Sequence, residues 1–132
     1  SEWGIGGVKQ GGDDAPLRPR MTLDASQHSP HADLAQVIAR LARIRHESRA
    51  LRRGTYQQLF VAHEQFAFAR RCDDEQVIVA VNAASEPARL RLPVAASDGQ
   101  QFTDMLNGAQ QFHVHGDHLE IDVPPCWARI LR

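Results

Sequence analysis

Apolar and polar residues alternate along most of the chain after residue 55. Leu90, Leu92 and Val94 alternate with Arg89 and Arg91, which predicts a strand with one face on a core and the other in water. Further short segments of this kind are bounded by turn residues, and we expect strands at 56–62, 66–72, 76–82, 102–104, 111–115, 118–123 and 127–131. Short strands at this spacing are typical of a two-sheet antiparallel sandwich.

The segment 76–82 departs from the alternation. Val77, Val79 and Val81 lie on one side of such a strand, and Ile78 and Ala80 lie on the other. A strand that is apolar on both sides is usually central and covered on both faces. We therefore expect this strand in the middle of a sheet.

Turn residues separate the later strands. Asn107-Gly108 is a strong turn signal, and Gly116-Asp117 is expected to form a two-residue hairpin turn. Pro124-Pro125 ends the strand before it, and the segment 127–131 can then close a sheet.

A helix is expected before the strands. Ser29 followed by Pro30 forms a typical helix start. Apolar residues then recur at helical spacing, at Leu34, Val37, Ile38, Leu41 and Ile44. The pattern fades after Glu47, and Gly54 ends the segment.

The first 28 residues read as one long loop, because they hold the densest cluster of glycines (Gly4, Gly6, Gly7, Gly11 and Gly12). The organisation predicted from these patterns is a loop over 1–28, a helix and link over 29–53, and a β-domain over 54–132. The expected fold class is mainly β: an N-terminal loop and one helix, followed by an antiparallel, Greek-key-like β-sandwich.

Composition narrows the class of protein. The chain has 132 residues, 42% of them hydrophobic and 23% charged, which is ordinary for one globular domain. The net charge of −1 gives no electrostatic case for a nucleic-acid or membrane partner. The two cysteines, Cys72 and Cys126, lie far apart, so a reducing compartment is the default and one long-range disulfide stays open.

Three histidines near one turn are the candidate metal site. His113 and His115 share a strand face, and His118 follows across the turn, so three imidazoles there can bind zinc. Polar residues are also normal at the end of a sheet, and no carboxylate or cysteine at ligand spacing completes the set. We favour the ordinary interpretation and expect no metal and no cofactor.

Other candidates also have ordinary interpretations that we favour. A solvated or domain-facing helix surface explains the candidate nucleic-acid patch formed by Arg40, Arg43, Arg45, Arg49, Arg52 and Arg53. Either cysteine can be a nucleophile, but we expect both to be small buried hydrophobic side chains. Trp3, Tyr56 and Trp127 can stack on sugar rings, although we expect core packing for Tyr56 and Trp127.

Two loop features remain. Gly4, Gly6 and Gly7 lack the full spacing of a phosphate loop, so we reject that interpretation. Asp13 and Asp14 supply carboxylates and Arg18 supplies a guanidinium, and together these side chains can hydrogen-bond several hydroxyls of a polyol. The same residues can equally form a salt bridge that pins the loop, and the residues alone leave both alternatives open.

Several short motifs, taken in order, resemble the C-terminal part of an α-amylase family glycosidase of the cyclomaltodextrinase and neopullulanase type. Around the helix, the matching segments are Ser1-Glu2-Trp3-Gly4, Asp14-Ala15-Pro16-Leu17-Arg18, Leu41-Ala42-Arg43-Ile44-Arg45 and Ala50-Leu51-Arg52-Arg53-Gly54. In the β-domain they are Phe66-Ala67-Phe68-Ala69-Arg70 and Val79-Ala80-Val81-Asn82. The resemblance covers the whole chain, and its specificity lies in the order and spacing of the motifs.

The resemblance implies a role for each segment. The loop and helix would be the end of a (β/α)₈ barrel, and the sandwich would be the small domain that follows it. The family's reaction is retaining, through a covalent glycosyl-enzyme, and its catalytic carboxylates lie on earlier barrel strands. By motif match, Asp14 and Arg18 would bind a substrate sugar, with Ala15 standing where the family usually has proline.

We therefore expect the C-terminal fragment of a cytoplasmic retaining glycosidase that acts on α-glucans such as maltodextrins and cyclodextrins. The chain by itself would have no catalytic residue. Its partners would be the rest of the barrel and the glucan substrate, and the apolar helix stripe would favour self-association if it stays exposed. The alternatives are a free-standing β-sandwich that binds carbohydrate or protein and, third, a zinc-binding β-protein.

Overall fold

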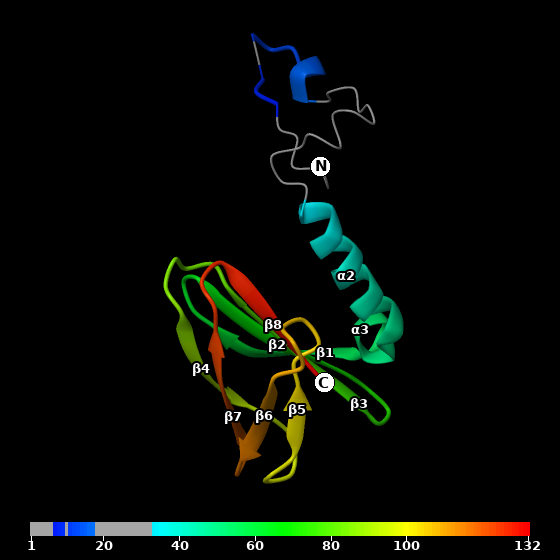
Figure 1. The fold of residues 1–132 in the computed structure, drawn as a ribbon, viewed down its shortest axis with the longest axis vertical. Helices are drawn as coiled ribbons and strands as arrows, with labels where there is room; N and C mark the ends of the chain where they lie inside the picture. The colour runs from blue at the N-terminus through cyan, green and yellow to red at the C-terminus, as the bar shows by residue number, and fades with distance from the viewer. Residues whose placement is uncertain (1–6, 10, 18–32) are drawn as a thin grey trace. The chain divides into compact units, whose positions relative to one another are not determined.

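The computed structural model describes residues 7–9, 11–17 and 33–132 (Figure 1). The chain divides into two units, Ser1–Arg43 and Ile44–Arg132, and each is described by itself. None of the helices in these described ranges is both long enough and apolar enough to cross a membrane.

The helical elements precede the strands, and one extended residue separates the last two helices. The described part begins with a 3-10 turn, η1 (Ala15–Leu17), and continues with the helices α2 (Leu34–Glu47) and α3 (Arg49–Arg53). The predicted start at Ser29-Pro30 lies outside the described residues.

The predicted end of the helical pattern at Glu47 is confirmed, because Ser48 adopts an extended conformation there. The Ser48 hydroxyl accepts a hydrogen bond from the Leu51 N–H at 3.0 Å, which caps the new helix. At Gly54 the backbone passes so close that a Cβ would lie 2.6 Å from the Ala50 and Arg71 carbonyl oxygens. Only glycine therefore fits between α3 and the first sheet.

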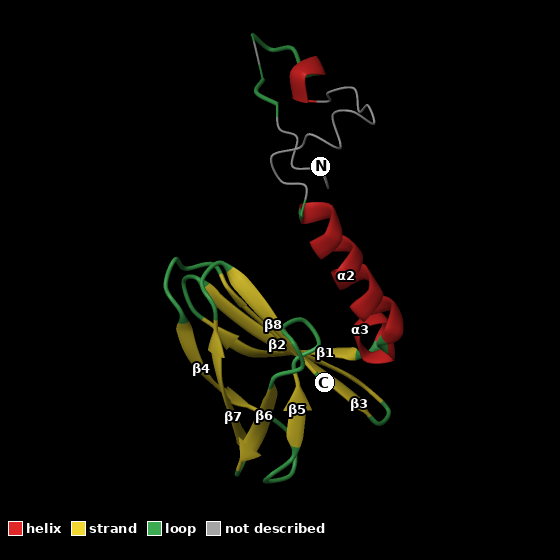
Figure 2. Ribbon diagram, in the orientation of Figure 1, coloured by secondary structure: helices red, strands yellow, loops and turns green. Residues whose placement is uncertain are grey.

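Two four-stranded antiparallel sheets form the sandwich, as the sequence predicts (Figure 2). The first has the order β1-β2-β3-β8 and comprises Thr55–Val61 (β1), Gln65–Cys72 (β2), Glu75–Asn82 (β3) and Trp127–Leu131 (β8). The second has the order β4-β7-β6-β5 and comprises Ala88–Pro93 (β4), Gln101–Thr103 (β5), Gln111–His115 (β6) and His118–Val123 (β7). In the second sheet β5, β6 and β7 follow one another and β4 lies beside β7, which is a Greek-key arrangement.

Alternation places the core between the two sheets. On each strand every second side chain points toward the other sheet. The inward-facing apolar side chains of the two sheets therefore meet in one buried cluster. Its fully buried members include Ile78, Ala80, Leu92, Phe102, Val114, Leu119, Ile121 and Leu131. The predicted hairpin turn is confirmed, because His115 pairs with His118 and Gly116 has a φ of +63°.

The strand β3 is central, between β2 and β8, as predicted. Its second face is only partly covered, however. Val77 packs with Ala50, Ile130 and other residues in a second buried cluster, whereas Val81 remains 39% exposed.

Candidate functional site

Asp14, the first predicted substrate-binding residue, lies immediately before η1. Its carboxylate forms an ion pair with Lys9 at 2.9 Å, and both side chains are exposed. The neighbouring Asp13 accepts a hydrogen bond from the Ala15 N–H at 2.9 Å, which fixes the turn. Arg18, the second predicted residue, lies outside the described residues, so the pairing of Asp14 with Arg18 stays a prediction.

The three candidate zinc ligands do not converge. His113 and His115 are exposed on β6, and His118 at the start of β7 contacts Asp117 instead. The Nδ1 atom of His118 also lies 3.4 Å from the guanidinium of Arg91. No three histidine, cysteine or acidic side chains in the described part of the chain are grouped so that they could hold a metal ion.

The arginines of α2 and α3 make local contacts. Arg49 pairs with Asp73 at 3.0 Å, and Arg45 donates to the Leu51 carbonyl at 2.5 Å. Arg52 donates to the Ser48 carbonyl at 3.3 Å. The contacts of Arg45 and Arg52 lie at the break between the two helices, and the Arg49–Asp73 pair joins α3 to the turn between β2 and β3.

Both cysteines are free, so the disulfide that the sequence left open is not formed. Cys72 is half-buried and packs at the edge of the second cluster. Cys126 is exposed, and the expectation of a buried hydrophobe is wrong there. It occupies a tight turn between β7 and β8 with a φ of +47°, and its thiol reaches only the carbonyls of Ala83 and Ala84.

The candidate aromatic residues have different environments. Trp127 is half-buried and its indole N–H donates to the Asn107 side-chain oxygen at 2.7 Å, so core packing is confirmed there. Tyr56 is 54% exposed, and the expectation of core packing is wrong. It lies on the outer face of the edge strand β1, where only the ring of Phe68 packs against it. Trp3, Gly4 and Gly6 lie outside the described residues.

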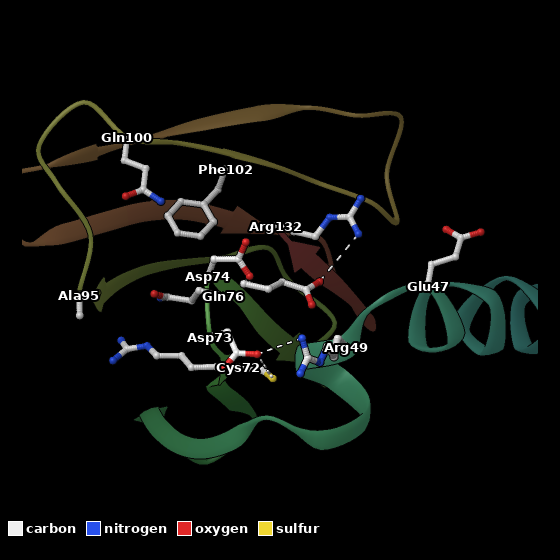
Figure 3. A pocket seen from close by; sticks show the side chains of 12 residues that line it. Glu47, Arg49, Cys72, Asp73, Asp74, Gln76, Ala95, Gln100, Phe102 and Arg132 are labelled. Carbon is white, nitrogen blue, oxygen red and sulfur yellow. Dashed lines mark hydrogen bonds and ion pairs between the residues drawn. The ribbon is translucent and has the colours of Figure 1, made fainter.

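A polar groove of about 790 Å³ lies at one end of the sandwich (Figure 3). Arg71 and Gln76 are cross-strand partners of β2 and β3 and share the side of the sheet that faces the core further along. Gln100 and Phe102 line the groove from the second sheet. The lining also includes Glu47, Arg49, Cys72, Asp73, Asp74, Glu75, Ala95 and Arg132.

Two acidic side chains of the groove already have partners. Asp73 pairs with Arg49, and Glu75 accepts a hydrogen bond from the Ala50 N–H at 2.8 Å and faces Arg132 at 3.8 Å. Burial alone would raise the pKa of Glu75, but the hydrogen bonds from Ala50 and Ser48, helped by Arg132, bring it below its ordinary value. Glu75 therefore acts as a fixed anion that holds the start of α3.

Two donors of the groove lack partners. The Arg71 Nε and Gln76 Nε2 atoms are buried and make no hydrogen bond. No histidine is among the residues that line the groove, so it offers no imidazole as a general base. The two free donors are suited to hydrogen-bonding the acceptors of a small polar molecule.

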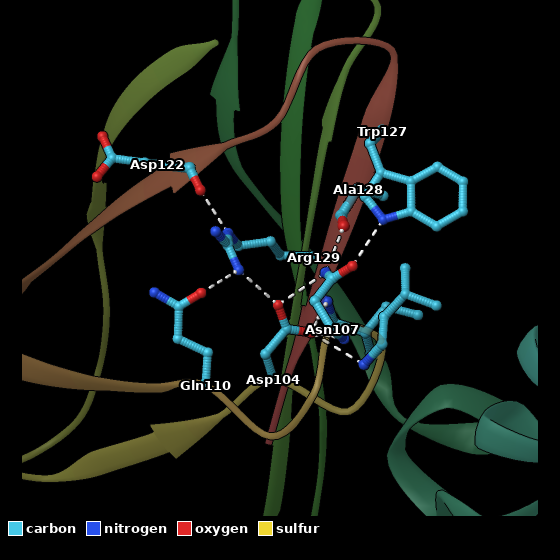
Figure 4. A network of polar contacts seen from close by, with 9 residues as sticks. Asp104, Asn107, Gln110, Asp122, Trp127, Ala128 and Arg129 are labelled. Atoms are coloured by element: carbon cyan, nitrogen blue, oxygen red, sulfur yellow. Dashed lines mark hydrogen bonds and ion pairs between the residues drawn. The ribbon is translucent and has the colours of Figure 1, made fainter.

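A buried polar network joins the two sheets next to this groove (Figure 4). Asp104, fully buried, accepts hydrogen bonds from Arg129 and Asn107 at 2.8 Å each. The Arg129 guanidinium also bonds Gln110 at 2.9 Å and lies 4.9 Å from the centre of the Phe112 ring. Sequence reasoning missed this network; the available signal was a charged residue, Arg129, inside the apolar strand 127–131.

The family described as "Neopullulanase-like, C-terminal domain" matches residues 56–127. No curated protein matches the chain.

Solved structures with the same fold include two α-amylases and the protein AmyP. An Anoxybacillus α-amylase superimposes with a TM-score of 0.77 at 20% identity, covering 93% of this chain and 26% of its own. The Geobacillus thermoleovorans α-amylase complexed with acarbose superimposes with a TM-score of 0.79 at 20% identity, and the match covers 94% of this chain and 27% of the α-amylase. AmyP in complex with maltotriose superimposes with a TM-score of 0.75 at 22% identity, and the match covers 95% of this chain and 27% of AmyP.

The chain thus spans about a quarter of the length of these enzymes. The family match covers more than half of the chain and falls on the two-sheet sandwich described above. This chain belongs to the family described as "Neopullulanase-like, C-terminal domain".

Proposed function

We propose that this chain is the C-terminal part of a larger, retaining glycoside hydrolase that acts on α-glucans, and that it is not catalytic by itself. One observation carries the proposal. The structural likeness includes more than nine-tenths of this chain but only about a quarter of each α-amylase. The missing three quarters would hold the catalytic carboxylates, and the sandwich would brace the barrel that carries them.

The proposed substrate class is supported by the same relatives. AmyP is solved in complex with maltotriose, and the Geobacillus thermoleovorans α-amylase is solved in complex with acarbose. In the proposed enzyme, Asp14 and Arg18 contact hydroxyl groups of the bound glucan. A reducing, cytoplasmic location is part of the proposal and is supported by the two free thiols.

The first experiment measures the mass of the natural protein with an antibody raised to this chain. We expect a band several times larger than 14.7 kDa and activity of that product on cyclodextrins and maltooligosaccharides. A band at 14.7 kDa would contradict the proposal outright.

The role of Asp14 is tested in the same product by Asp14→Asn. Losing a charged hydrogen bond to substrate costs about 1.5–3 kcal/mol, so kcat/KM for maltotriose should fall roughly 10- to 100-fold. Lys9→Gln is the matched control, because it removes the Lys9–Asp14 ion pair and keeps the carboxylate. Equal losses in both variants would show that Asp14 only pins the loop, and an unchanged kcat/KM in Asp14→Asn would remove the subsite role.

The exposed ring of Tyr56 favours the alternative, a free-standing carbohydrate-binding sandwich. Titration of this chain with maltooligosaccharides separates the two. The proposed enzyme part should show no binding that depends on Tyr56, whereas the alternative requires saturable binding that Tyr56→Ala abolishes.

A further inference from the structure

The polar groove at the end of the sandwich lies where polar side chains replace the apolar core between the two sheets. Arg71 and Gln76 face each other across β2 and β3. Two positions further along the same side of the sheet, Ala69 and Ile78 are fully buried in the core. Figure 3 shows Gln100 on the opposite side of the groove from Gln76. The groove therefore borders directly on the apolar core.

Three side chains offer hydrogen-bond donors to this space. The Nε atom of Arg71 and the Nε2 atom of Gln76 are buried and make no hydrogen bond within the described part of the chain. The main-chain carbonyl of Gln100 accepts the Val114 N–H at 2.9 Å, and its side-chain oxygen accepts the Ser97 N–H at 3.3 Å. The amide N–H groups of Gln100 therefore remain as donors. Since a buried donor without a partner is unfavourable, the groove favours a molecule that brings acceptors.

One positive charge in the groove has no counter-ion among the described residues. Arg49 pairs with Asp73 at 3.0 Å, and Arg132 faces Glu75 at 3.8 Å. Arg71 forms no ion pair with any residue in the described ranges. A guanidinium beside an apolar core attracts an opposite charge more strongly than it would in water. The groove is therefore suited to one negative charge.

The acidic residues of the groove restrict the ligand further. Glu47 and Asp74 also line the groove and are exposed carboxylates. They would repel the second charge of a phosphate dianion. They can also accept hydrogen bonds, which the hydroxyl groups of a ligand can donate. A carboxylate carries a single charge, and its two oxygens match the planar fork of a guanidinium.

We propose that this groove binds a small hydroxy acid with a single carboxylate. The carboxylate accepts hydrogen bonds from Arg71, Gln76 and Gln100, and the hydroxyl groups donate to Asp74. The groove volume of about 790 Å³ is sufficient for such a molecule. The site involves neither of the residues proposed to contact the glucan, so it goes beyond the proposed function and does not depend on it.

Calorimetric titration of this chain at pH 7 and low ionic strength is the first test, with gluconate as the probe. Sorbitol is the matched neutral probe, because it has the same carbon chain and hydroxyls with a CH₂OH group in place of the carboxylate. We expect one gluconate per chain, and binding of sorbitol and of inorganic phosphate that is weaker by roughly tenfold or more. Equal binding of sorbitol, tighter binding of phosphate or no binding of gluconate would each overturn the proposal.

Substitutions in the groove locate the bound gluconate. Arg71→Gln should weaken binding roughly tenfold or more, because it removes the charge that faces the carboxylate. Gln76→Leu should weaken it severalfold, and this variant should fold because it removes a buried donor that has no partner. Arg91→Gln, on the exposed face of the second sheet, is the matched control and should bind as the natural chain does. Melting curves check that each variant is folded, and unchanged affinity in folded Gln76→Leu and Arg71→Gln would overturn the site.

The same titration of the longer natural protein distinguishes this inference from the proposed function. Equal affinity for gluconate in the longer protein would support the site, whether or not that protein acts on α-glucans. Loss of gluconate binding in an active longer protein would show that other protein fills the groove, and it would overturn the site while supporting the proposed function. A natural product of 14.7 kDa that binds gluconate would do the reverse.

Discussion

The two outer faces of the sandwich differ sharply although the two inner faces share one core. On the second sheet, β4 and β7 carry Arg89, Arg91, Glu120 and Asp122 outward, all exposed, and Arg89 pairs with Glu120 at 2.8 Å. On the first sheet the outward positions hold mostly apolar side chains, namely Tyr56, Val61, Phe66, Phe68, Val79 and Val81. The charged face is suited to water, whereas the outer face of the first sheet exposes large apolar side chains, with Tyr56 54% and Val61 58% exposed.

The two outer faces differ because their strands have different patterns of apolar and polar residues. β4 and β7 alternate strictly between apolar and charged residues, which suits a sheet with one wet side. β3 has no polar residue between Val77 and Val81. Strict alternation therefore gives the second sheet a charged outer face, and its loss in β3 leaves the first sheet with an apolar one.

The largest effect is expected where the two sheets are joined. Arg129→Met leaves the fully buried Asp104 carboxylate without its cation, and breaking a buried pair in this way costs about 3–5 kcal/mol. Urea unfolding of this chain measures the loss. The same change at Arg89, on the charged face, is the matched control and should leave the midpoint almost unchanged.

An equal effect of the two substitutions would contradict the contrast between buried and exposed arginines. If Arg129→Met proves nearly neutral, the network does not hold the sheets together, and the core cluster alone accounts for their packing.

A smaller effect is expected at the covered end of the first sheet. Glu75→Gln removes the carboxylate that accepts the Ala50 N–H, so α3 should hold less tightly and the free energy of unfolding should fall by about 1 kcal/mol at pH 7. Because folding lowers the pKa of Glu75, its stabilisation is present above the unfolded-state pKa and is lost as the pH falls through the folded-state value. Glu75→Gln should therefore show less loss of stability on acidification than the natural chain.

The control for this prediction is Glu86→Gln, because Glu86 is exposed in the loop between β3 and β4. Urea unfolding at pH 7 and pH 4 measures both variants. If the two curves change alike, Glu75 does not anchor α3.

Most strands of this fold could be predicted because their signals are local. Alternation and turn chemistry placed the segments 111–115 and 118–123 and the turn at Gly116-Asp117 as the structure has them. The break at Ser48 was visible in the fading helical pattern. What failed was the burial of Tyr56, because it depends on whether another element covers the face, and no local pattern records that.

The candidate sites were harder to predict because they combine distant segments. Asp104 and Arg129 lie 25 positions apart, and the groove brings Arg71 and Gln76 against Gln100. Sequence spacing cannot show such proximity without the sheet order. Asp14 was selected by its chemistry and by a motif, yet its observed partner, Lys9, was not anticipated.

The smallest effect is expected on the charged face itself. Glu120→Gln removes the Arg89–Glu120 pair. The hydrogen bond from Arg89 and then its charge lower the pKa of Glu120, so the pair stabilises the fold above the unfolded-state pKa and ceases to do so as the pH falls through the folded-state value. Both side chains are largely in water, so salt should screen the contribution.

Urea unfolding at pH 7 should show a slight loss of stability in low salt that disappears in about 1 M NaCl, where the Debye length is about 3 Å. Asp122→Asn is the matched control, since Asp122 lies opposite Arg89 in register while Arg89 bonds Glu120 instead. A loss that persists in high salt, or that equals the effect of Glu75→Gln, would mean that the charged face is held by specific contacts and is not simply a solvated surface.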